Sequence, residues 1–563
     1  MKCHTQYTMR IVSSALMACV ATLVLLWLLA GGLSALAAPV KAPASELKVC
    51  PSGCAYSSIQ EAVDAADHGD VIKVAQGEYT DVHHIASLST GSFTATQIVA
   101  ITRSITLRGG YNDDFTTWDP EIHHTILDAR EQGRVVVVSG AGINPTIEGL
   151  HITGGDSSGL GGSVYDYDGG GGIYVLYSSA VISGNQIYSN TAYRGAGVWL
   201  QDCTATFRSN NVRDNTAGWA GAGMWLYRSP SILQGNHVVS NAAIFAGGMA
   251  LHLSDATLSG NAILSNTASS SEGGGVMLIS SQATLDGNLI CANRTDEAGG
   301  GLCIFDSDAL LTNNVIADNY AQRLGSGIHV QGSAPRLVHT TIARNGGGGG
   351  GLYAVTSTLG LVSDVIMTNT IIYSHTEGII AESGNTVTLH ATLWHANDTG
   401  WIGAGAISHT RDYSGDPAFD ADGYHLTGAS AAIDKGVGAG ATADIDGDTR
   451  PAGISPDLGA DEFIPVALTR VSVDGPNEGL IDRSYIFTAT VSPLTATTPI
   501  AYTWVPTPAG KQGANVAVYS WSAPGTKTIT ITVENVAGAA PSGVHTIYIQ
   551  AYKVYLPLVV RGG

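Results

Sequence analysis

A glycine followed by an apolar residue returns along the middle of the chain at a period of about 25 residues. The pairs are Gly172-Ile173, Gly197-Val198, Gly223-Met224, Gly248-Met249, Gly275-Val276, Gly301-Leu302, Gly327-Ile328 and Gly351-Leu352. Repetition at a fixed period of this size indicates that equivalent units stack on one another. We therefore expect a solenoid in which equivalent positions of successive coils lie directly above one another.

Asparagine occupies two further columns in the same phase. One column holds Asn190, Asn215, Asn241, Asn266, Asn293, Asn319, Asn345 and Asn369. The column before it holds Asn185, Asn210, Asn236, Asn261, Asn288 and Asn314, and then continues as Thr340 and Asp364. Side-chain amides that stack on identical neighbours can form hydrogen-bonded ladders. We therefore interpret these asparagines as structural and not as catalytic.

Apolar residues alternate within each repeat, which is the period of a β-strand. Three inward-facing columns follow from this alternation, and they begin at Ile173, Ile182 and Ile187. Each coil therefore offers three short strands, which close into a triangular tube with a spacing of about 4.8 Å between stacked strands. The predicted fold is all-β, with a right-handed parallel β-helix of three strands per coil as its main body.

The motif Gly-Ile-x-x…Asn-x-Ile-x-x-Asn resembles the repeat of the pectin-lyase-like β-helix superfamily. The segment from Tyr56 to Tyr79 resembles the start of that superfamily, where an amphipathic helix caps the open end of the tube before the first strand. The resemblance covers residues 47–463 and implies the fold. It does not specify an activity, because this solenoid hosts lyases, hydrolases, adhesins and inert surface proteins.

The composition changes after the solenoid. Residues 433–462 resemble a closing segment of bacterial surface β-helix proteins, so we assign residues 38–463 to the β-helix with its N-terminal cap and closing segment. Residues 466–550 are rich in Val, Thr, Ile and Tyr and alternate from Thr526 to Val533, which is typical of a small β-sandwich. They resemble the immunoglobulin-like and PKD-like modules of secreted bacterial proteins. Residues 551–563 are assigned to a C-terminal tail.

The N-terminus has the order of a secretory signal. Lys2 and Arg10 precede an apolar run over residues 11–30, and the small residues Ala35 and Ala37 follow it. We predict a signal peptide over residues 1–37, with an uncleaved membrane anchor as the alternative. The protein is then expected to be extracellular or at the cell surface.

Cysteine usage and charge narrow the partners further. In an oxidising compartment, Cys50 and Cys54 can close a small loop, and the remaining cysteines after residue 37 are expected to be small core or surface residues. The formal net charge is −20, so nucleic acid and anionic membrane surfaces are poor partners. No lysine occurs between Lys73 and Lys435, which argues against a catalytic lysine in that region.

The strand after each repeated glycine carries aromatic residues in the outward phase. If Val198 points inward, then Trp199 points outward, and Tyr174 and Trp225 occupy the equivalent positions one coil away. Aromatic faces pack against the C–H faces of sugars, so we predict a carbohydrate-binding strip on this face. Its predicted members are Tyr174, Trp199, Trp225, Tyr227, His252, Phe305, His329 and Tyr353.

Loops after the second asparagine column place further side chains beside this strip. They are Tyr193, Arg194, Trp219, Phe245, Glu272, Asp296, Glu297 and Arg323. The alternative to ligand binding is structural packing, because aromatic residues favour strands and because loops or the C-terminal sandwich can cover them. Exposure of Trp199 and Trp225 distinguishes the two interpretations.

Catalysis would need more than an aromatic strip. Glycoside hydrolysis requires a pair of carboxylates that flank the bond, and the Asn-Thr-Asp, Asp-Asp, Gly-His-Gly and Arg-Ile-Lys blocks of polygalacturonase-like members are not found on the solenoid. The only adjacent aspartate pair, Asp113-Asp114, precedes the regular repeat. Asp296, Glu297 and Arg323 are candidates for the acidic and basic groups of a calcium-assisted lyase. No catalytic residue is assigned.

A candidate metal site lies in the closing segment. Asp444, Asp446 and Asp448 alternate around Gly447, as the carboxylates of calcium-binding loops do. We predict Ca²⁺ binding by these three aspartates, and the alternative is an aspartate-rich turn paired with Arg450.

These features predict a secreted or cell-surface β-helix protein that binds a polysaccharide or surface glycan or mediates adhesion. One alternative is a polysaccharide lyase or glycoside hydrolase that acts on acidic polysaccharide. The other is a structural envelope protein whose solenoid serves as a rigid rod.

Overall fold

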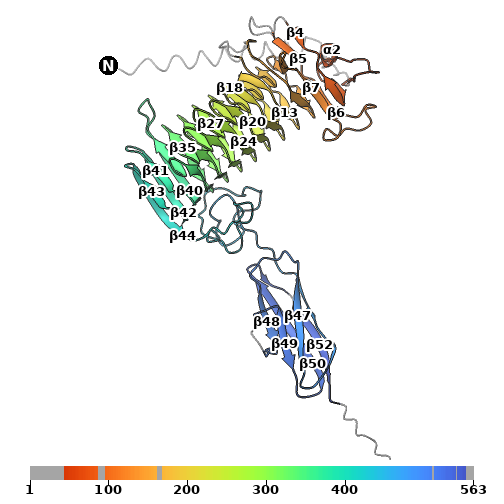
Figure 1. Ribbon diagram of the computed structural model, residues 1–563, viewed down its shortest axis with the longest axis vertical. Helices are drawn as coiled ribbons and strands as arrows, with labels where there is room; N and C mark the ends of the chain where they lie inside the picture. The colour runs from red at the N-terminus through yellow and green to blue at the C-terminus, as the bar shows by residue number, and fades with distance from the viewer. Residues whose placement is uncertain (1–43, 86–94, 161–167, 510–512, 541, 553–563) are drawn as a thin grey trace, which may run out of the picture. The chain divides into compact units, whose positions relative to one another are not determined.

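The computed structural model describes residues 44–85, 95–160, 168–509, 513–540 and 542–552. The predicted signal peptide lies outside these residues, as does the tail from residue 553 onward. Stacked coils of parallel strands make up most of the described chain, and two further sheets follow from Arg470 (Figure 1). Among the described residues, no helix has both the length and the apolar character that a membrane span requires.

The N-terminal part begins with a strand. β1 (Glu46–Val49) pairs in parallel with β2 (Val71–Ala75), and α2 (Ile59–Ala65) lies between them in sequence, capped by the Ser58 side chain. The other elements of this part are β3 (Gly77–Tyr79), β4 (His83–Ile85), β5 (Ala95–Ile101), β6 (Thr106–Tyr111), β7 (Thr125–Asp128), β8 (Arg134–Ser139), β9 (Thr146–Glu148) and β10 (His151–Thr153). The capping helix is thus present, but the expectation that it precedes the first strand is wrong, because β1 adds a rung ahead of it.

The middle coils, residues 173–355, form two faces that join the N-terminal strands in one 24-stranded sheet. The first face contains β12 (Val181–Ser183), β16 (Thr206–Arg208), β20 (Ile232–Gln234), β24 (Thr257–Ser259), β28 (Thr284–Asp286), β32 (Leu310–Thr312) and β36 (Arg336–Val338). The second contains β13 (Gln186–Tyr188), β17 (Asn211–Arg213), β21 (His237–Val239), β25 (Ala262–Leu264), β29 (Leu289–Cys291), β33 (Val315–Ala317) and β37 (Thr341–Ala343).

The third face is a 13-stranded sheet that begins with β4, β5 and β8 and is parallel except for the antiparallel pairing of β4 with β5. It continues with β11 (Ile173–Leu176), β15 (Val198–Gln201), β19 (Met224–Tyr227), β23 (Met249–His252), β27 (Val276–Ile279), β31 (Leu302–Phe305), β35 (Ile328–Gln331), β39 (Leu352–Val355), β41 (Glu377–Ala381) and β43 (Thr399–Ile402). The last coils also contribute β40 (Asp364–Tyr373), β42 (Thr386–His395) and β44 (Ala406–Ser414) to the 24-stranded sheet.

A short fourth ladder adds to the three predicted strands per coil. It contains β14 (Thr191–Arg194), β18 (Thr216–Ala220), β22 (Ala242–Ala243), β26 (Thr267–Ala268), β30 (Arg294–Thr295), β34 (Tyr320–Ala321) and β38 (Gly346–Gly347). These strands lie between the second asparagine column and the glycine column, in the segments that the sequence marks only as loops.

The interior of the tube is hydrocarbon throughout the middle coils. All members of the three predicted inward columns are fully buried there, from Ile173, Ile182 and Ile187 to Ile328 and Ile342. The strand pairing stacks each on its equivalent in the next coil, as Val198 on Ile173 and Val212 on Ile187. Burial of stacked aliphatic side chains is the main stabilising contribution to such a tube.

Two asparagine ladders run along the corners of the tube, as predicted. The Asn241 Nδ2 donates to Asn266 Oδ1 at 3.0 Å and to the Val212 carbonyl at 2.9 Å, while its Oδ1 accepts from Asn215 Nδ2 at 3.0 Å. Equivalent bonds join the other column from Asn185 to Asn314. Both columns are buried, so each amide satisfies backbone groups at a turn that water cannot reach.

The predicted phase fails at the coil that follows Asn345. Ile342 pairs with Ile372, so His375 and not Asn369 stands over Asn345, whose Nδ2 donates to His375 Nε2 at 3.2 Å. The equivalent shift places Thr370, not Asp364, over Thr340. Residues inserted before β40 lengthen this coil, and the ladder continues through Asn397, whose Oδ1 lies 3.1 Å from His375 Nδ1.

A third ladder, of hydroxyl groups, was not predicted. The side-chain oxygens of Ser254, Ser281, Ser307 and Ser333 each accept the backbone N–H of the equivalent residue one coil before. Cys203 continues this buried column, with its Sγ 3.4 Å from Ser229 Oγ.

Cys203 and Cys303 are buried and Cys291 is half-buried, while Cys50 and Cys54 form a disulfide, as the sequence predicts.

The irregular part of the chain is longer than the predicted closing segment of residues 433–462. Residues 415–463, called the closing segment from here on, are almost free of regular structure and pack beside the tube. Asn313 Nδ2 donates to the Ala443 carbonyl at 3.0 Å, and Arg344 donates to the Gly423 carbonyl at 2.9 Å. Ile445 and Ala460 pack with the outward residue Val315 of the second face. The segment therefore covers the outer surface of that face near its C-terminal coils.

The residues after the solenoid form two small sheets around their own core. One sheet contains β45 (Arg470–Asp474), β47 (Ser484–Ser492) and β49 (Val516–Ser520). The other contains β46 (Glu478–Leu480), β48 (Ala501–Val505), β50 (Gly525–Asn535), β51 (Gly538–Ala539) and β52 (Gly543–Gln550). Phe487, Trp504 and Ile531 come from both sheets and are buried together, which is the packing of a β-sandwich. The likeness to immunoglobulin-like or PKD-like modules stays a prediction.

Candidate functional site

The predicted aromatic strip has the expected register on the third face. Trp199 pairs with Tyr174 on one side and with Trp225 on the other, and the Tyr174 and Trp199 ring centroids lie 5.5 Å apart. These residues point away from the hydrocarbon interior and form an apolar cluster of their own.

The strip is nevertheless not a surface. Only 1% of Tyr174, 2% of Trp199 and 4% of Trp225 is exposed, and His329 and Tyr353 are also buried. Tyr227, His252 and Phe305 are half-buried. The expectation of an open carbohydrate-binding strip is therefore wrong for the buried members, and the packing interpretation holds for them.

Glycine-rich backbone and two arginines cover the strip. A Cβ added to Gly169 would lie 1.5 Å from Trp199 Cε3, so only glycine lets the chain lie this close to the indole. The Arg194 guanidinium lies 5.0 Å from the Trp225 ring centroid, and Arg134 lies 5.7 Å from that of Tyr174. Ala220, from the short fourth ladder, packs in the same cluster. The third face thus has a second apolar layer outside the tube.

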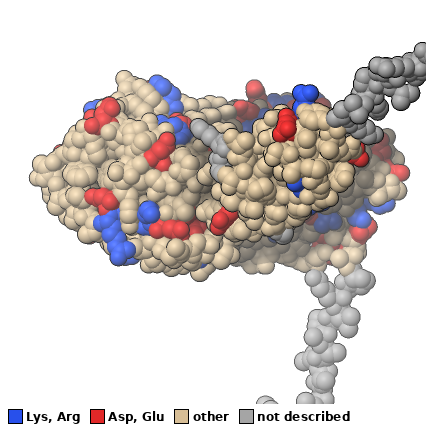
Figure 2. All heavy atoms as spheres, turned by 90° about the horizontal axis from the view of Figure 1, so that it is seen from below, with Lys and Arg blue, Asp and Glu red and all other residues tan. Residues whose placement is uncertain are grey.

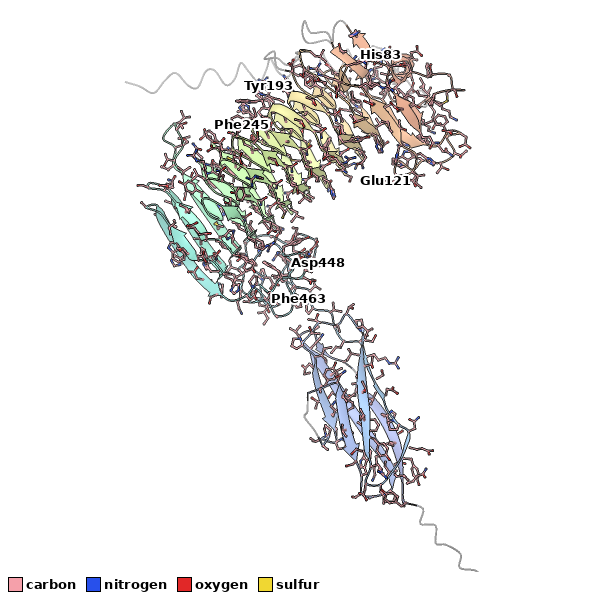
Figure 3. The ribbon with its side chains drawn as sticks, viewed as in Figure 1. His83, Glu121, Tyr193, Phe245, Asp448 and Phe463 are labelled. Atoms are coloured by element: carbon pink, nitrogen blue, oxygen red, sulfur yellow. A yellow bond between two sulfur atoms is a disulfide. The ribbon has the colours of Figure 1, made fainter. Side chains whose placement is uncertain are left out.

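A different set of rings lies on the outside of this layer, which we call the outer aromatic ladder: Tyr193, Trp219 and Phe245. The Tyr193 and Trp219 rings are stacked with centroids 6.1 Å apart and an interplanar angle of 10°, and Trp219 lies 4.5 Å from Phe245. Tyr193 is 37% exposed and the other two are partly buried. Figure 3 labels Tyr193 and Phe245 along one edge of the solenoid. The sequence placed these residues beside the predicted strip, and they are the ones that reach the surface.

Charged side chains continue along the coils that follow the outer aromatic ladder. Arg323 pairs with Glu297 at 2.8 Å, and Arg294 lies 3.5 Å from Asp296. On the face drawn in Figure 2, acidic and basic side chains form small groups on a mostly uncharged surface. Glu297 and Arg323 pair with each other. Neither side chain is therefore arranged as the calcium ligand or the proton acceptor of a calcium-assisted lyase.

The aspartate pair Asp113-Asp114 does not have the properties of a catalytic acid. Asp114 Oδ1 accepts from the Thr116 backbone N–H at 3.1 Å, and Asp113 accepts from Gln76 at 3.0 Å. Hydrogen bonds from the Thr116 side chain and backbone lower the pKa of Asp114. A general acid requires a raised pKa, so Asp114 does not suit that role and acts as a turn-forming group.

The predicted calcium loop is also organised differently. Asp444 is buried, and its Oδ1 accepts the backbone N–H groups of Asp446 at 2.9 Å and Asp448 at 2.8 Å. Its Oδ2 accepts the Glu462 N–H at 2.9 Å. Asp444 thus holds the turn together, and the three aspartates do not converge on one point among the described residues. Arg450 forms its ion pair with Glu462 at 2.9 Å and not, among the described residues, with an aspartate of this turn, while calcium binding by the three aspartates stays a prediction.

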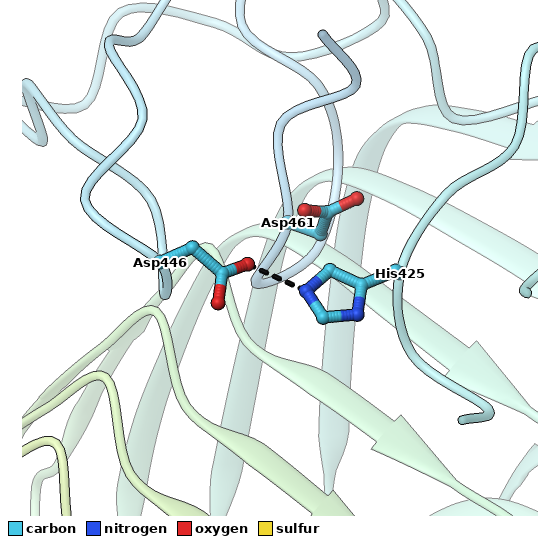
Figure 4. A group of neighbouring side chains, drawn as sticks. All are labelled: His425, Asp446 and Asp461. Carbon is cyan, nitrogen blue, oxygen red and sulfur yellow. Dashed lines mark hydrogen bonds and ion pairs between the residues drawn. The ribbon is translucent and has the colours of Figure 1, made fainter. Parts of the chain in front are cut away.

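Asp446 instead meets a histidine from another part of the closing segment. His425 Nε2 lies 2.5 Å from Asp446 Oδ2, its Nδ1 is bonded to Asp422, and the buried carboxylate of Asp461 lies beside them (Figure 4). Burial lowers the pKa of His425, but hydrogen bonds to Asp422 and Asp446 outweigh it and raise the pKa to about 9. Burial raises the pKa of Asp461 to about 6. Sequence reasoning missed this group because its members are far apart in the chain.

Comparison with known families agrees with the observed fold. The model of the right handed beta helix region matches residues 121–263 and 254–412, which together span more than half of the chain. No curated protein is significantly similar in sequence. The matched residues include all the middle coils, and the parallel ladders also extend to the strands before residue 121. The chain belongs to the right-handed β-helix family.

Proposed function

We propose that this protein is a secreted or cell-surface β-helix that binds a polysaccharide along its outer aromatic ladder. The observation that carries the proposal is the row of rings on three consecutive coils, on the outside of the covering layer: Tyr193 and Trp219 are stacked, and Phe245 contacts Trp219 at an interplanar angle of 48°. Sugar rings stack on aromatic faces through their C–H groups while their hydroxyls stay solvated.

The ladder is fixed in place by the strands that carry it. β14 and β18 pair in parallel, and Ala220 bridges to Phe245, so the backbone positions that carry the rings are held by the coils. A preorganised surface loses little conformational entropy when a ligand binds. The net charge of −20 favours an uncharged polysaccharide over an acidic one, because like charges repel.

Localisation is part of the same proposal. The signal peptide predicted over residues 1–37 would export the chain, and the disulfide between Cys50 and Cys54 suits an oxidising compartment.

A glycan array and affinity electrophoresis in soluble polysaccharides test the proposal. Wild-type protein is expected to bind at least one glycan, and Trp219→Ala to weaken that binding about fivefold, since one aromatic contact contributes on the order of 1 kcal/mol. Trp401→Ala is the matched control, because Trp401 is 39% exposed and lies on β43, away from the ladder. Absence of binding by the wild type, or an equal loss in both variants, would contradict the proposal.

A further inference from the structure

Three parts of the closing segment bring metal-ligating atoms together. His425, Asp446 and Asp461 each offer one ligand atom, and these atoms all lie within 4.8 Å of one another. The residues come from separate turns of the chain, which Figure 4 shows converging on one point. Such convergence of distant residues is more specific than a run of neighbouring aspartates.

The imidazole of His425 is already oriented toward this point. Its Nδ1 is held by Asp422, so its Nε2 faces Asp446 at 2.5 Å. Histidines that ligate metals commonly donate their other ring N–H to a carboxylate, which fixes the orientation of the ring. Asp422 has that position here.

Asp461 adds a buried carboxylate with little compensation. Only 6% of the residue is exposed, and its Oδ2 accepts one hydrogen bond, from the Leu426 backbone N–H at 2.6 Å. In the described part of the chain, no lysine or arginine forms an ion pair with it. The positive groups that act on this carboxylate are His425 and, without a direct ion pair, Arg450, and a metal ion would add a directly bonded positive partner.

We propose that His425, Asp446 and Asp461 bind a divalent transition-metal ion, with Zn²⁺ as its best representative. Imidazole nitrogen suits zinc and related metals, whereas Ca²⁺ prefers six or more oxygen ligands. Zinc bonds of about 2.1 Å place tetrahedral ligand atoms about 3.4 Å apart, so side-chain shifts of about 1 Å close the site. The ion takes the place of the proton on His425 Nε2, which is released to solvent.

The metal would fix the closing segment on the tube. Asp446 follows Ile445, which packs with Leu289 and Val315 on the outer surface of the second face. Asp461 follows Ala460, whose N–H donates to Thr341 Oγ1 at 3.0 Å. A bond from each aspartate to one ion links both contacts to the turn that carries His425. The site does not involve the outer aromatic ladder, so it is independent of glycan binding.

Equilibrium dialysis tests the site on full-length protein that lacks a histidine tag and has been treated with EDTA. Wild-type protein is expected to retain about one equivalent of Zn²⁺, in preference to Ca²⁺, and to melt a few degrees higher with the metal than without it. His425→Gln and Asp446→Asn are each expected to lower the affinity at least tenfold and to reduce the metal-dependent shift in Tm at the same Zn²⁺ concentration.

Asp448→Asn is the matched control, because Asp448 lies in the same turn as Asp446 but outside the converging group. It is expected to bind Zn²⁺ as the wild type does. Circular dichroism in EDTA establishes that each variant is folded. The proposal is overturned if the wild type holds no stoichiometric Zn²⁺, if His425→Gln binds it equally well, or if Ca²⁺ is preferred.

Discussion

The middle coils and the closing segment both contain buried turns whose backbone groups need hydrogen-bond partners. The two regions supply these partners with different side chains. In the middle coils, buried turns are satisfied by neutral amides and hydroxyls that repeat from coil to coil, as Asn241 and Ser281 do. In the closing segment, which has no repeat, the buried backbone N–H groups are accepted by carboxylates such as Asp444 and Asp457. Where the chain repeats, identical neutral side chains can bond to one another from coil to coil. Where it does not repeat, carboxylates accept several backbone N–H groups at once because each has two oxygens with several lone pairs.

The difference has an energetic consequence. A neutral ladder contributes little per bond but is continuous, so its stability is distributed over many coils. The closing segment concentrates charge at a few positions, and its buried carboxylates depend on Arg450. Single substitutions are therefore expected to act more strongly in the closing segment than in the middle coils.

Removal of Arg450 should have the largest effect. The Arg450 and Glu462 side chains are 0% and 1% exposed, and Arg450 also donates to the Gly459 carbonyl at 2.9 Å. Arg450→Ala leaves a buried carboxylate unpaired, which we expect to cost about 3–5 kcal/mol of unfolding free energy. Chemical denaturation and limited proteolysis of the closing segment measure the loss. The exposed pair of Arg323 with Glu297 supplies the control, since Arg323→Ala should change stability far less.

A break in the amide ladder should cost less. Asn241→Ala removes the acceptor of the Asn215 N–H and the donor to the Val212 carbonyl, and leaves both backbone groups buried. We expect a loss of about 2–3 kcal/mol, measured by denaturant unfolding. Asn211→Ala is the control, because Asn211 lies on the outer side of β17 and outside both ladders. A larger loss of unfolding free energy in Asn241→Ala than in Arg450→Ala would contradict the expectation that the closing segment is the more sensitive region.

The same contrast explains what the sequence could predict. Inward columns and asparagine ladders follow from a period, and residues such as Ile187 and Asn241 repeat it faithfully. The burial of Trp199 could not be predicted from the alternation, because it depends on the glycine-rich backbone at Gly169 that lies against the indole. The meeting of His425 with Asp446 depends on how an irregular segment folds back, which sequence spacing does not encode. Tyr193 and Trp219 do share a column, so the outer aromatic ladder carried a readable signal.

The smallest expected effect is a pH dependence of stability that comes from two buried histidines. One lies in the amide ladder and the other beside the closing segment. His375 lies in the amide ladder between Asn345 and Asn397, and burial lowers its pKa to about 4. His339 faces the closing segment, where its Nδ1 lies 3.1 Å from the Asp457 carbonyl, and burial lowers its pKa to about 3. Arg344 near His375 and Arg450 near His339 lower the pKa further.

Both histidines are therefore neutral in the folded chain but gain a proton in the unfolded chain below its ordinary pKa of about 6.5. Their contribution to stability is complete above that pH and is lost as the pH falls toward 4. Together they should lower the unfolding free energy by about 1.5 kcal/mol between pH 8 and pH 6, which denaturant titrations at the two pH values measure. His375→Asn restores the ladder residue without a titrating group, so it should halve this change while leaving stability at pH 8 nearly unaltered. An unchanged pH dependence in His375→Asn would contradict the contribution assigned to His375 and would leave the loss of stability to other groups with lowered pKa values, such as His339 and His151.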